Sequence, residues 1–174
     1  MRISVSVILI AILSVVLASA VYADKSVAKQ ASGQLAAAVK ENNLPKIEGL
    51  LKTGTNVNER DASNNTPLML AASSGYTGAM KLLIDSGAFV TARNIEGKTA
   101  LMWAASTNQL EAMNVLLTSG AEVDDRNNSD ETALMMAASQ GHSDAVKILI
   151  DTKADVNAQD KLGWTPVIWA TTSG

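Results

Sequence analysis

The chain has 174 residues, with 14 Lys and Arg against 17 Asp and Glu, so its formal net charge is −3. This acidic balance, without a basic cluster, excludes proteins that bind nucleic acid by neutralising its phosphates. The absence of Cys excludes disulfide frameworks, cysteine zinc sites, catalytic thiols and iron–sulfur clusters, and a single His excludes a multi-histidine metal site. We therefore expect no nucleic acid, metal ion or cofactor as a ligand.

Residues 1–23 have the layout of a secretory signal peptide: a positive start, an apolar stretch and small residues before the polar Asp24. Cleavage patterns end at residue 20 and at residue 23, and the change in composition at residue 24 favours the second. With the absence of Cys, this segment predicts an exported bacterial protein, periplasmic or secreted, with residues 24–31 as a linker. Left uncleaved, the segment would make the protein a membrane-anchored scaffold. After cleavage we expect no contact with the membrane.

A period of 33 residues follows. Threonines recur at this spacing, each followed by Pro or Ala, then by Leu or Val, at Thr66, Thr99, Thr132 and Thr165. Adjacent alanines and later pairs of Leu or Ile keep the same register through three units. A repeat of this length predicts a solenoid of stacked units that share one core.

Within each unit, the Thr predicts a helix N-cap and the Pro or Ala the first helical position. The alanine pair indicates a first helix that packs closely, and a second amphipathic helix follows, ended by Gly87 or Gly120 in the left-handed conformation. Residues 88–93 then alternate in polarity and run into a turn with Asn and Gly. This pattern predicts a short β-hairpin finger.

These stretches resemble the ankyrin repeat family: TPLMLAASSGYTGAMKLLIDSGAFVTAR from Thr66, TALMWAASTNQLEAMNVLLTSGAEVDDR from Thr99, and TALMMAASQGHSDAVKILIDTKADVNAQ from Thr132. The resemblance implies an all-α, ankyrin-type solenoid of stacked helix pairs with short β-hairpin fingers. It covers residues 32–174, as an N-terminal cap (32–60), three repeats (61–93, 94–126 and 127–159) and a partial repeat (160–174).

Three departures from the repeat carry predictions. The cap starts with Gly33-Gln34 in place of Thr-Pro and has a polar outer face. Lys153 occupies a glycine position, where a left-handed backbone costs on the order of 1 kcal/mol. The last unit has one helix, so Val167, Ile168 and Trp169 should be partly exposed, and this end is a candidate surface for self-association.

The resemblance also implies a non-enzymatic protein-binding module that uses the fingertips and the inner face of the first helices. The partner is a protein that the sequence does not identify, and a secreted effector that binds host proteins is an alternative function. The predicted protein-binding residues are Arg93, Ile95, Glu96, Lys98, Thr107, Arg126, Asn128, Glu131, Gln140 and Trp164. Arg93 with Glu96 and Arg126 with Asp130 are alternatively solvated ion pairs. Trp164 alternatively packs on the neighbouring hairpin.

Other patterns have a structural and a chemical interpretation, and the structural one is favoured for each. Met69, Met102 and Met135 form a column that fills the core or, alternatively, binds copper(I) or buffers oxidation. His142 lies in an interhelical turn and, without a marked nucleophile and acid, predicts no catalytic residues. The third finger is acidic, with Asp124, Asp125, Asp130 and Glu131, and is a solvated tip or, alternatively, a site for a divalent cation or a basic partner.

Overall fold

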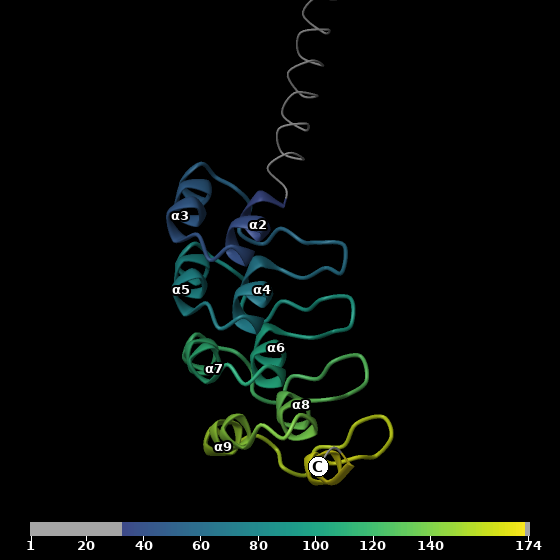
Figure 1. Ribbon diagram of the computed structural model, residues 1–174. Helices are drawn as coiled ribbons and strands as arrows, with labels where there is room; N and C mark the ends of the chain where they lie inside the picture. The colour runs from purple at the N-terminus through teal and green to yellow at the C-terminus, as the bar shows by residue number, and fades with distance from the viewer. Residues whose placement is uncertain (1–32, 173–174) are drawn as a thin grey trace, which may run out of the picture.

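The computed structural model describes residues 33–172, a part of the chain that contains nine α-helices and no β-strand. The helices stack in two rows (Figure 1). The inner row consists of α2 (Gln34–Lys40), α4 (Pro67–Ser73), α6 (Ala100–Ser106), α8 (Ala133–Ser139) and α10 (Pro166–Thr172). The outer row consists of α3 (Leu44–Lys52), α5 (Thr77–Asp85), α7 (Leu110–Thr118) and α9 (Ser143–Asp151). The predicted signal peptide (1–23) and linker (24–31) lie outside the described residues.

The threonine caps are confirmed. The hydroxyl oxygens of Thr66, Thr99 and Thr132 accept hydrogen bonds from the backbone N–H groups three residues later, at 3.3, 3.4 and 3.4 Å. Pro67 occupies the first turn of α4, where a missing N–H leaves no helical bond unmade. Each cap therefore starts an inner helix at the same point of its repeat.

The core runs the length of the stack. Leu68, Leu101 and Leu134 are at most 2% exposed, and the alanine pairs beside them let successive inner helices approach closely. The column of Met69, Met102 and Met135 is 1% exposed throughout, as the core-filling interpretation requires. Buried thioethers of this kind are not available as ligands at the surface.

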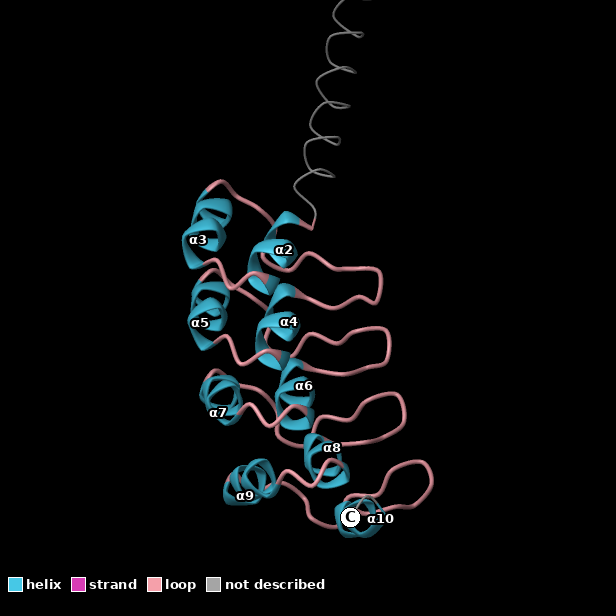
Figure 2. Ribbon diagram, viewed as in Figure 1, coloured by secondary structure: helices cyan, strands magenta, loops and turns pink. Residues whose placement is uncertain are grey.

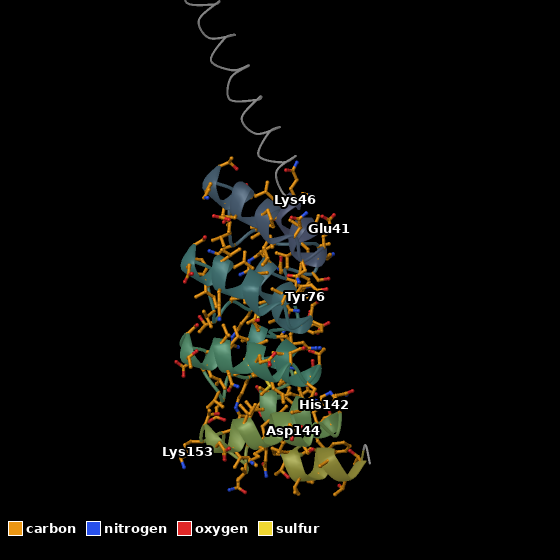
Figure 3. All side chains as sticks on the ribbon, turned by 60° about the vertical axis from the view of Figure 1, so that its left-hand side comes forward. Glu41, Lys46, Tyr76, His142, Asp144 and Lys153 are labelled. Atoms are coloured by element: carbon orange, nitrogen blue, oxygen red, sulfur yellow. The ribbon has the colours of Figure 1, made fainter. Side chains whose placement is uncertain are left out.

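The second helices end in the left-handed conformation. Gly87 and Gly120 have φ values of 87° and 91°, and Lys153 adopts the same conformation with φ 71°. Glycine takes this conformation without a Cβ penalty, whereas lysine does not. The sequence-based expectation of strain at Lys153 therefore has its structural basis, and the side chain points away from the stack (Figure 3).

The fingers are the segments between each outer helix and the next inner helix, numbered in chain order. They project to one side of the stack as loops, not as the predicted β-hairpins (Figure 2). In the second finger, Asn94 Oδ1 accepts hydrogen bonds from the backbone N–H groups of Glu96 and Lys98, at 3.0 and 2.9 Å. The Asn94 side chain thus binds backbone N–H groups that would otherwise be free to donate across a β-hairpin. The hairpin prediction was wrong in this detail, although the fingers themselves are present.

The two ends of the stack differ. At the amino-terminal end, Glu41 and Lys46 are exposed and form an ion pair of 3.3 Å (Figure 3), in line with the predicted polar cap. At the other end, Val167 is 69% exposed, Ile168 is 36% exposed and Trp169 is half-buried. From Gly33 to Thr172, no helix is long and apolar enough to cross a bilayer.

Candidate protein-binding surface

Each finger is built around one buried or half-buried side-chain oxygen. Its acceptor, the Oδ1 atom of an Asp or Asn, receives the backbone N–H groups two and four residues later at 2.8–3.0 Å. These residues recur every 33 positions, as Asp61, Asn94, Asn127 and Asp160. This column was not among the predicted features, although its spacing of 33 residues is visible in the sequence. The column gives all four fingers the same shape.

The surroundings of Asp61 in the first finger shift its pKa. Burial by itself raises the pKa of Asp61, but hydrogen bonds from the Asn65 side chain and from the Asn65 and Ser63 backbones favour the carboxylate. The pKa of Asp61 is therefore held below its usual value of 3.8. The first finger thus depends on a charged side chain where the second and third use a neutral one.

Neighbouring fingertips are joined by the backbone. The N–H groups of Ile95, Asn128 and Lys161 donate to the carbonyl oxygens of Ser63, Glu96 and Ser129, at 3.0, 2.9 and 3.0 Å. One such bond links each finger to the next. The tips therefore form one continuous surface whose spacing is set before any partner arrives.

Arginine side chains that recur once per unit, which we call the arginine column, hold the fingers together from one unit to the next. The Nη1 atoms of Arg60, Arg93 and Arg126 each donate a 2.7 Å hydrogen bond to a carbonyl oxygen 33 residues later, at Arg93, Arg126 and Gln159. Two of these arginines, Arg93 and Arg126, were predicted to contact a partner. Their Nη1 atoms bond to the neighbouring unit, so both arginines position the fingers, and their contact with a partner stays a prediction.

The predicted ion pairs also differ from those observed. Arg93 pairs with Asp125 and not with Glu96, which pairs with Lys98 at 2.7 Å. Arg126 donates to the backbone oxygen of Asp130, at 3.4 Å, and not to its carboxylate. The difference arises because the arginines reach along the stack to the next finger, a contact that spacing within one finger does not reveal.

Large side chains line the inner helices at one register position. In the three full repeats they follow the buried methionine, as Leu70, Trp103 and Met136, and in the last unit Trp169 follows Ile168. Lys98 Nζ lies 5.0 Å from the centroid of the Trp103 ring, within the range of a cation–π contact. Trp164 packs edge to face on Trp169, with ring centroids 5.1 Å apart. The residue at the base of a finger thus covers the inner helix of its own unit.

Trp103 was not among the predicted site residues, although the register of the repeat places it on the inner face. Its Nε1 atom is buried without a hydrogen-bond partner. A hollow of about 80 Å³ lies beside it, lined also by Asn65, Met69, Leu70 and Ser73. The packing of Trp164 on Trp169 likewise replaces the predicted contact of Trp164 with a neighbouring hairpin.

The ten predicted residues differ in their exposure to solvent and in whether their side chains already bond to a neighbouring finger. Lys98, Arg126, Glu131 and Trp164 are half-buried, and Arg93 is exposed but hydrogen-bonded along the stack. Ile95 is 62% exposed at a fingertip, and Glu96 and Asn128 are exposed beside it. Two more exposed residues follow inner helices, namely Thr107 and Gln140. Five of the ten predicted residues are therefore exposed without serving in the arginine column.

His142 and the acidic third finger, which were also considered for chemistry, have structural contacts. His142 Nε2 lies 3.1 Å from the backbone oxygen of Ser106 in the preceding unit, which fits the structural role expected for it (Figure 3). In the acidic third finger, Asp125 binds Arg93, and Asp124 accepts the backbone N–H of Asp155 at 2.9 Å. Residues 33–172 contain no group of three or more His, Cys, Asp or Glu residues placed to hold a metal ion.

Comparisons with known proteins agree with this architecture. A family model described as ankyrin repeats in three copies matches residues 35–127, and a second, described as ankyrin repeats in many copies, matches residues 116–170. A search of curated proteins found no match. The two matched ranges cover all nine described helices except the first residue of α2 and the last two of α10.

Proposed function

The chain belongs to the ankyrin repeat family, and from this premise we propose that its fingertips and inner helices form one surface for a protein partner. Ankyrin repeats are protein–protein interaction scaffolds and are generally not enzymes. The observation that carries the proposal is the joining of fingertips by backbone hydrogen bonds of 2.9–3.0 Å. A surface ordered before binding loses less conformational entropy when the partner docks.

The exposed residues of this surface suggest the character of the contact. Ile95 supplies an apolar anchor at a tip, and Glu96 and Asn128 add polar groups next to it. Thr107 and Gln140 extend the surface toward the inner helices. Anchors of this kind dominate binding energy when a partner encloses them, while the surrounding polar contacts set the fit.

The test is a crosslinking co-purification from cells that make the protein naturally. The bait is compared with a variant that carries Ile95→Ala, Thr107→Ala and Gln140→Ala, three exposed positions outside the arginine column. Phe89→Ala is the matched control, because Phe89 is 64% exposed but follows an outer helix instead of lying at a tip. We expect one protein to be recovered by wild type and control and reduced at least about fivefold with the triple variant. Equal recovery with all three baits would contradict the proposal.

We also propose that the scaffold acts outside the cytoplasm, in the periplasm of a bacterium or beyond the cell. Support comes from the sequence of residues 1–23, which has the layout of a signal peptide. The intact mass of the naturally produced protein tests this, with a chain that begins at Asp24 as the expected result. A mass that retains residues 1–23 would contradict cleavage and favour a membrane-anchored scaffold instead.

A further inference from the structure

A small hollow lies on the inner helices, between α4 and α6, which pack side by side (Figure 1). It has a volume of about 80 Å³ and is lined by side chains from the base of the first finger and from both helices, namely Asn65, Met69, Leu70, Ser73 and Trp103. Met69 is buried at 1% exposure, whereas the other four residues are half-buried and reach the surface. A partner that covers the inner helices can therefore place a side chain in the hollow.

The repeat explains why the hollow lies at this position. In the next unit, Lys98 and Trp103 hold the register positions of Asn65 and Leu70. Lys98 Nζ lies 5.0 Å from the centroid of the Trp103 ring, so these two long side chains cover the inner helix there. The first full repeat has shorter side chains at both positions, and its inner helix is left with an open space.

The lining determines what kind of group can enter. No charged residue lines the hollow, and its two polar side chains already have hydrogen-bond partners. Asn65 donates from Nδ2 to Asp61 Oδ2 at 3.1 Å and accepts at Oδ1 from Asn94 Nδ2 at 2.9 Å. Ser73 Oγ donates to the backbone oxygen of Leu70 at 3.0 Å. A charged group in the hollow would lose its water without gaining an opposite charge, whereas an aliphatic group would gain apolar contacts.

We propose that the hollow receives one branched aliphatic side chain, a Val, Leu or Ile, of the protein partner. This inference rests on the function proposed above and specifies the chemistry of the partner at one point of that surface. Because Trp103 Nε1 is buried, the indole offers no accessible donor to the group that enters. An apolar cavity of about 150 Å³ holds benzene, with six carbon atoms, so a hollow of about 80 Å³ holds about three or four. Side chains enclosed in such pockets dominate the binding energy of an interface.

The hollow adjoins residues of the proposed surface on both sides. The finger that carries Asn65 accepts the backbone N–H of Ile95 at the carbonyl oxygen of Ser63, at 3.0 Å. On the α6 side, Thr107 Oγ1 donates to the backbone oxygen of Trp103 at 2.9 Å. A partner that contacts Ile95 and Thr107 is therefore within reach of the hollow.

Xenon tests whether the hollow is an apolar binding site, because xenon enters cavities lined by aliphatic and aromatic side chains. NMR follows the Met69 methyl group and the Trp103 indole N–H of the naturally processed chain under rising xenon pressure. We compare Ser73→Leu, which fills the hollow, with Ser74→Leu, which adds the same side chain at an exposed residue outside its lining. We expect saturable shifts in wild type and Ser74→Leu, and at least about tenfold weaker binding in Ser73→Leu. Circular dichroism checks that both variants fold. No shift at either group in wild type, or equal binding in Ser73→Leu, would overturn the proposal.

The crosslinking co-purification described above then tests the occupant. The protein recovered by wild type should be recovered equally by Ser74→Leu and at least about fivefold less by Ser73→Leu. A photoreactive group attached at position 74 should crosslink to a partner segment that contains Val, Leu or Ile. Changing that partner residue to Ala should weaken binding to wild type and have no further effect with Ser73→Leu, as expected for two side chains in contact.

The outcomes separate this inference from the proposed function. A partner recovered equally with Ser73→Leu, or one whose crosslinked segment has no aliphatic residue, would refute the assigned chemistry and leave the fingertip surface unchanged. The triple variant at Ile95, Thr107 and Gln140 alters no residue that lines the hollow. Equal recovery with that variant would therefore contradict the proposed function, while the binding of xenon is decided independently.

Discussion

The indole Nε1 of Trp169 donates a 3.0 Å hydrogen bond to Oδ2 of Asp160, whose other carboxylate oxygen shapes the last finger. One side chain thus joins a finger to the inner helix that follows it. Asn94 holds the same register position in the second finger, where Trp103 stands in place of Trp169. Its Nδ2 is a donor and bonds to Asn65 Oδ1, so it cannot accept from an indole. This difference accompanies the unpaired Nε1 of Trp103.

Asp160→Asn is expected to destabilise the last unit by about 1–3 kcal/mol, because an indole donor loses its acceptor while Oδ1 still holds the finger. Urea unfolding followed by tryptophan fluorescence measures the change. The same substitution in a Trp169→Phe background is the control, since no indole donor remains there. An equal loss in both backgrounds would assign the effect to charge instead of to the hydrogen bond.

Asn94→Asp is expected to raise the melting temperature. The new carboxylate offers Trp103 Nε1 the acceptor that Asp160 offers Trp169, and satisfying a buried donor is worth about 1–3 kcal/mol. The bond from Asn94 Nδ2 to Asn65 Oδ1 is lost, because the Asn65 amide keeps its orientation by donating to Asp61 Oδ2 at 3.1 Å, and the gain at Trp103 has to exceed this loss. The same substitution in a Trp103→Phe background is the control, because no indole donor remains there. An equal change of melting temperature in both backgrounds would contradict the prediction.

Glu59 provides the cap that the first helix lacks. Gly33, the N-cap of α2, has no side chain, and Glu59 accepts from the backbone N–H groups of Gly33 and Ala36, both at 3.0 Å. Glu59→Ala should therefore destabilise the amino-terminal unit by about 0.5–2 kcal/mol, as loss of a helix cap does. Hydrogen exchange at the Ala36 amide should accelerate. Glu59→Gln keeps one acceptor oxygen and should have a smaller effect; exchange unchanged in both variants would refute the role.

Lys153→Gly is expected to stabilise the protein by about 1 kcal/mol, because it relieves the left-handed backbone at φ 71°. Thermal unfolding measures the gain. Lys153→Ala removes the same charge and side chain but keeps the Cβ, so it should not raise the melting temperature. A melting temperature that falls with glycine would show that the Lys153 side chain contributes more than the strain costs.

The first finger should be acid-sensitive. Because the pKa of Asp61 is lowered on folding, its charged form stabilises the protein fully above its unfolded value of 3.8. That stabilisation is lost as the pH falls through the lowered folded pKa. Asp61→Asn keeps the Oδ1 acceptor, as Asn94 and Asn127 do, but removes the titration. The loss of unfolding free energy between about pH 7 and about pH 3 should be smaller in the variant; an equal loss would contradict this.

Much of the fold follows from local sequence. Thr66 and its counterparts start helices because a hydroxyl can cap a backbone N–H three residues away, and this contact needs no distant residue. The burial of Leu68 and Leu101 follows from the apolar register, and the strain at Lys153 from the glycine pattern of the repeat. These features are fixed within one unit, so their spacing along the chain was enough to predict them.

The candidate surface was predicted less completely. Ile95 and Gln140 are exposed where the repeat placed them, because the register determines which side of a unit a residue occupies. Arg93 and Arg126 were assigned to a partner because arginine often anchors interfaces. The choice between a partner and the next unit depends on a carbonyl oxygen 33 residues away. The arginine and this carbonyl oxygen are far apart along the chain but are neighbours in the folded stack.

The sequence by itself determined the period, the helix starts, the polar cap and an apolar carboxy-terminal end. Only the tertiary structure decided that the fingers are loops, that Glu59 caps α2, and that a hollow lies beside Trp103. The physical reason is the range of the interactions. Caps and apolar registers act over a few residues, whereas stacking brings together groups from different units, and a side chain's partners are then set by how those units pack.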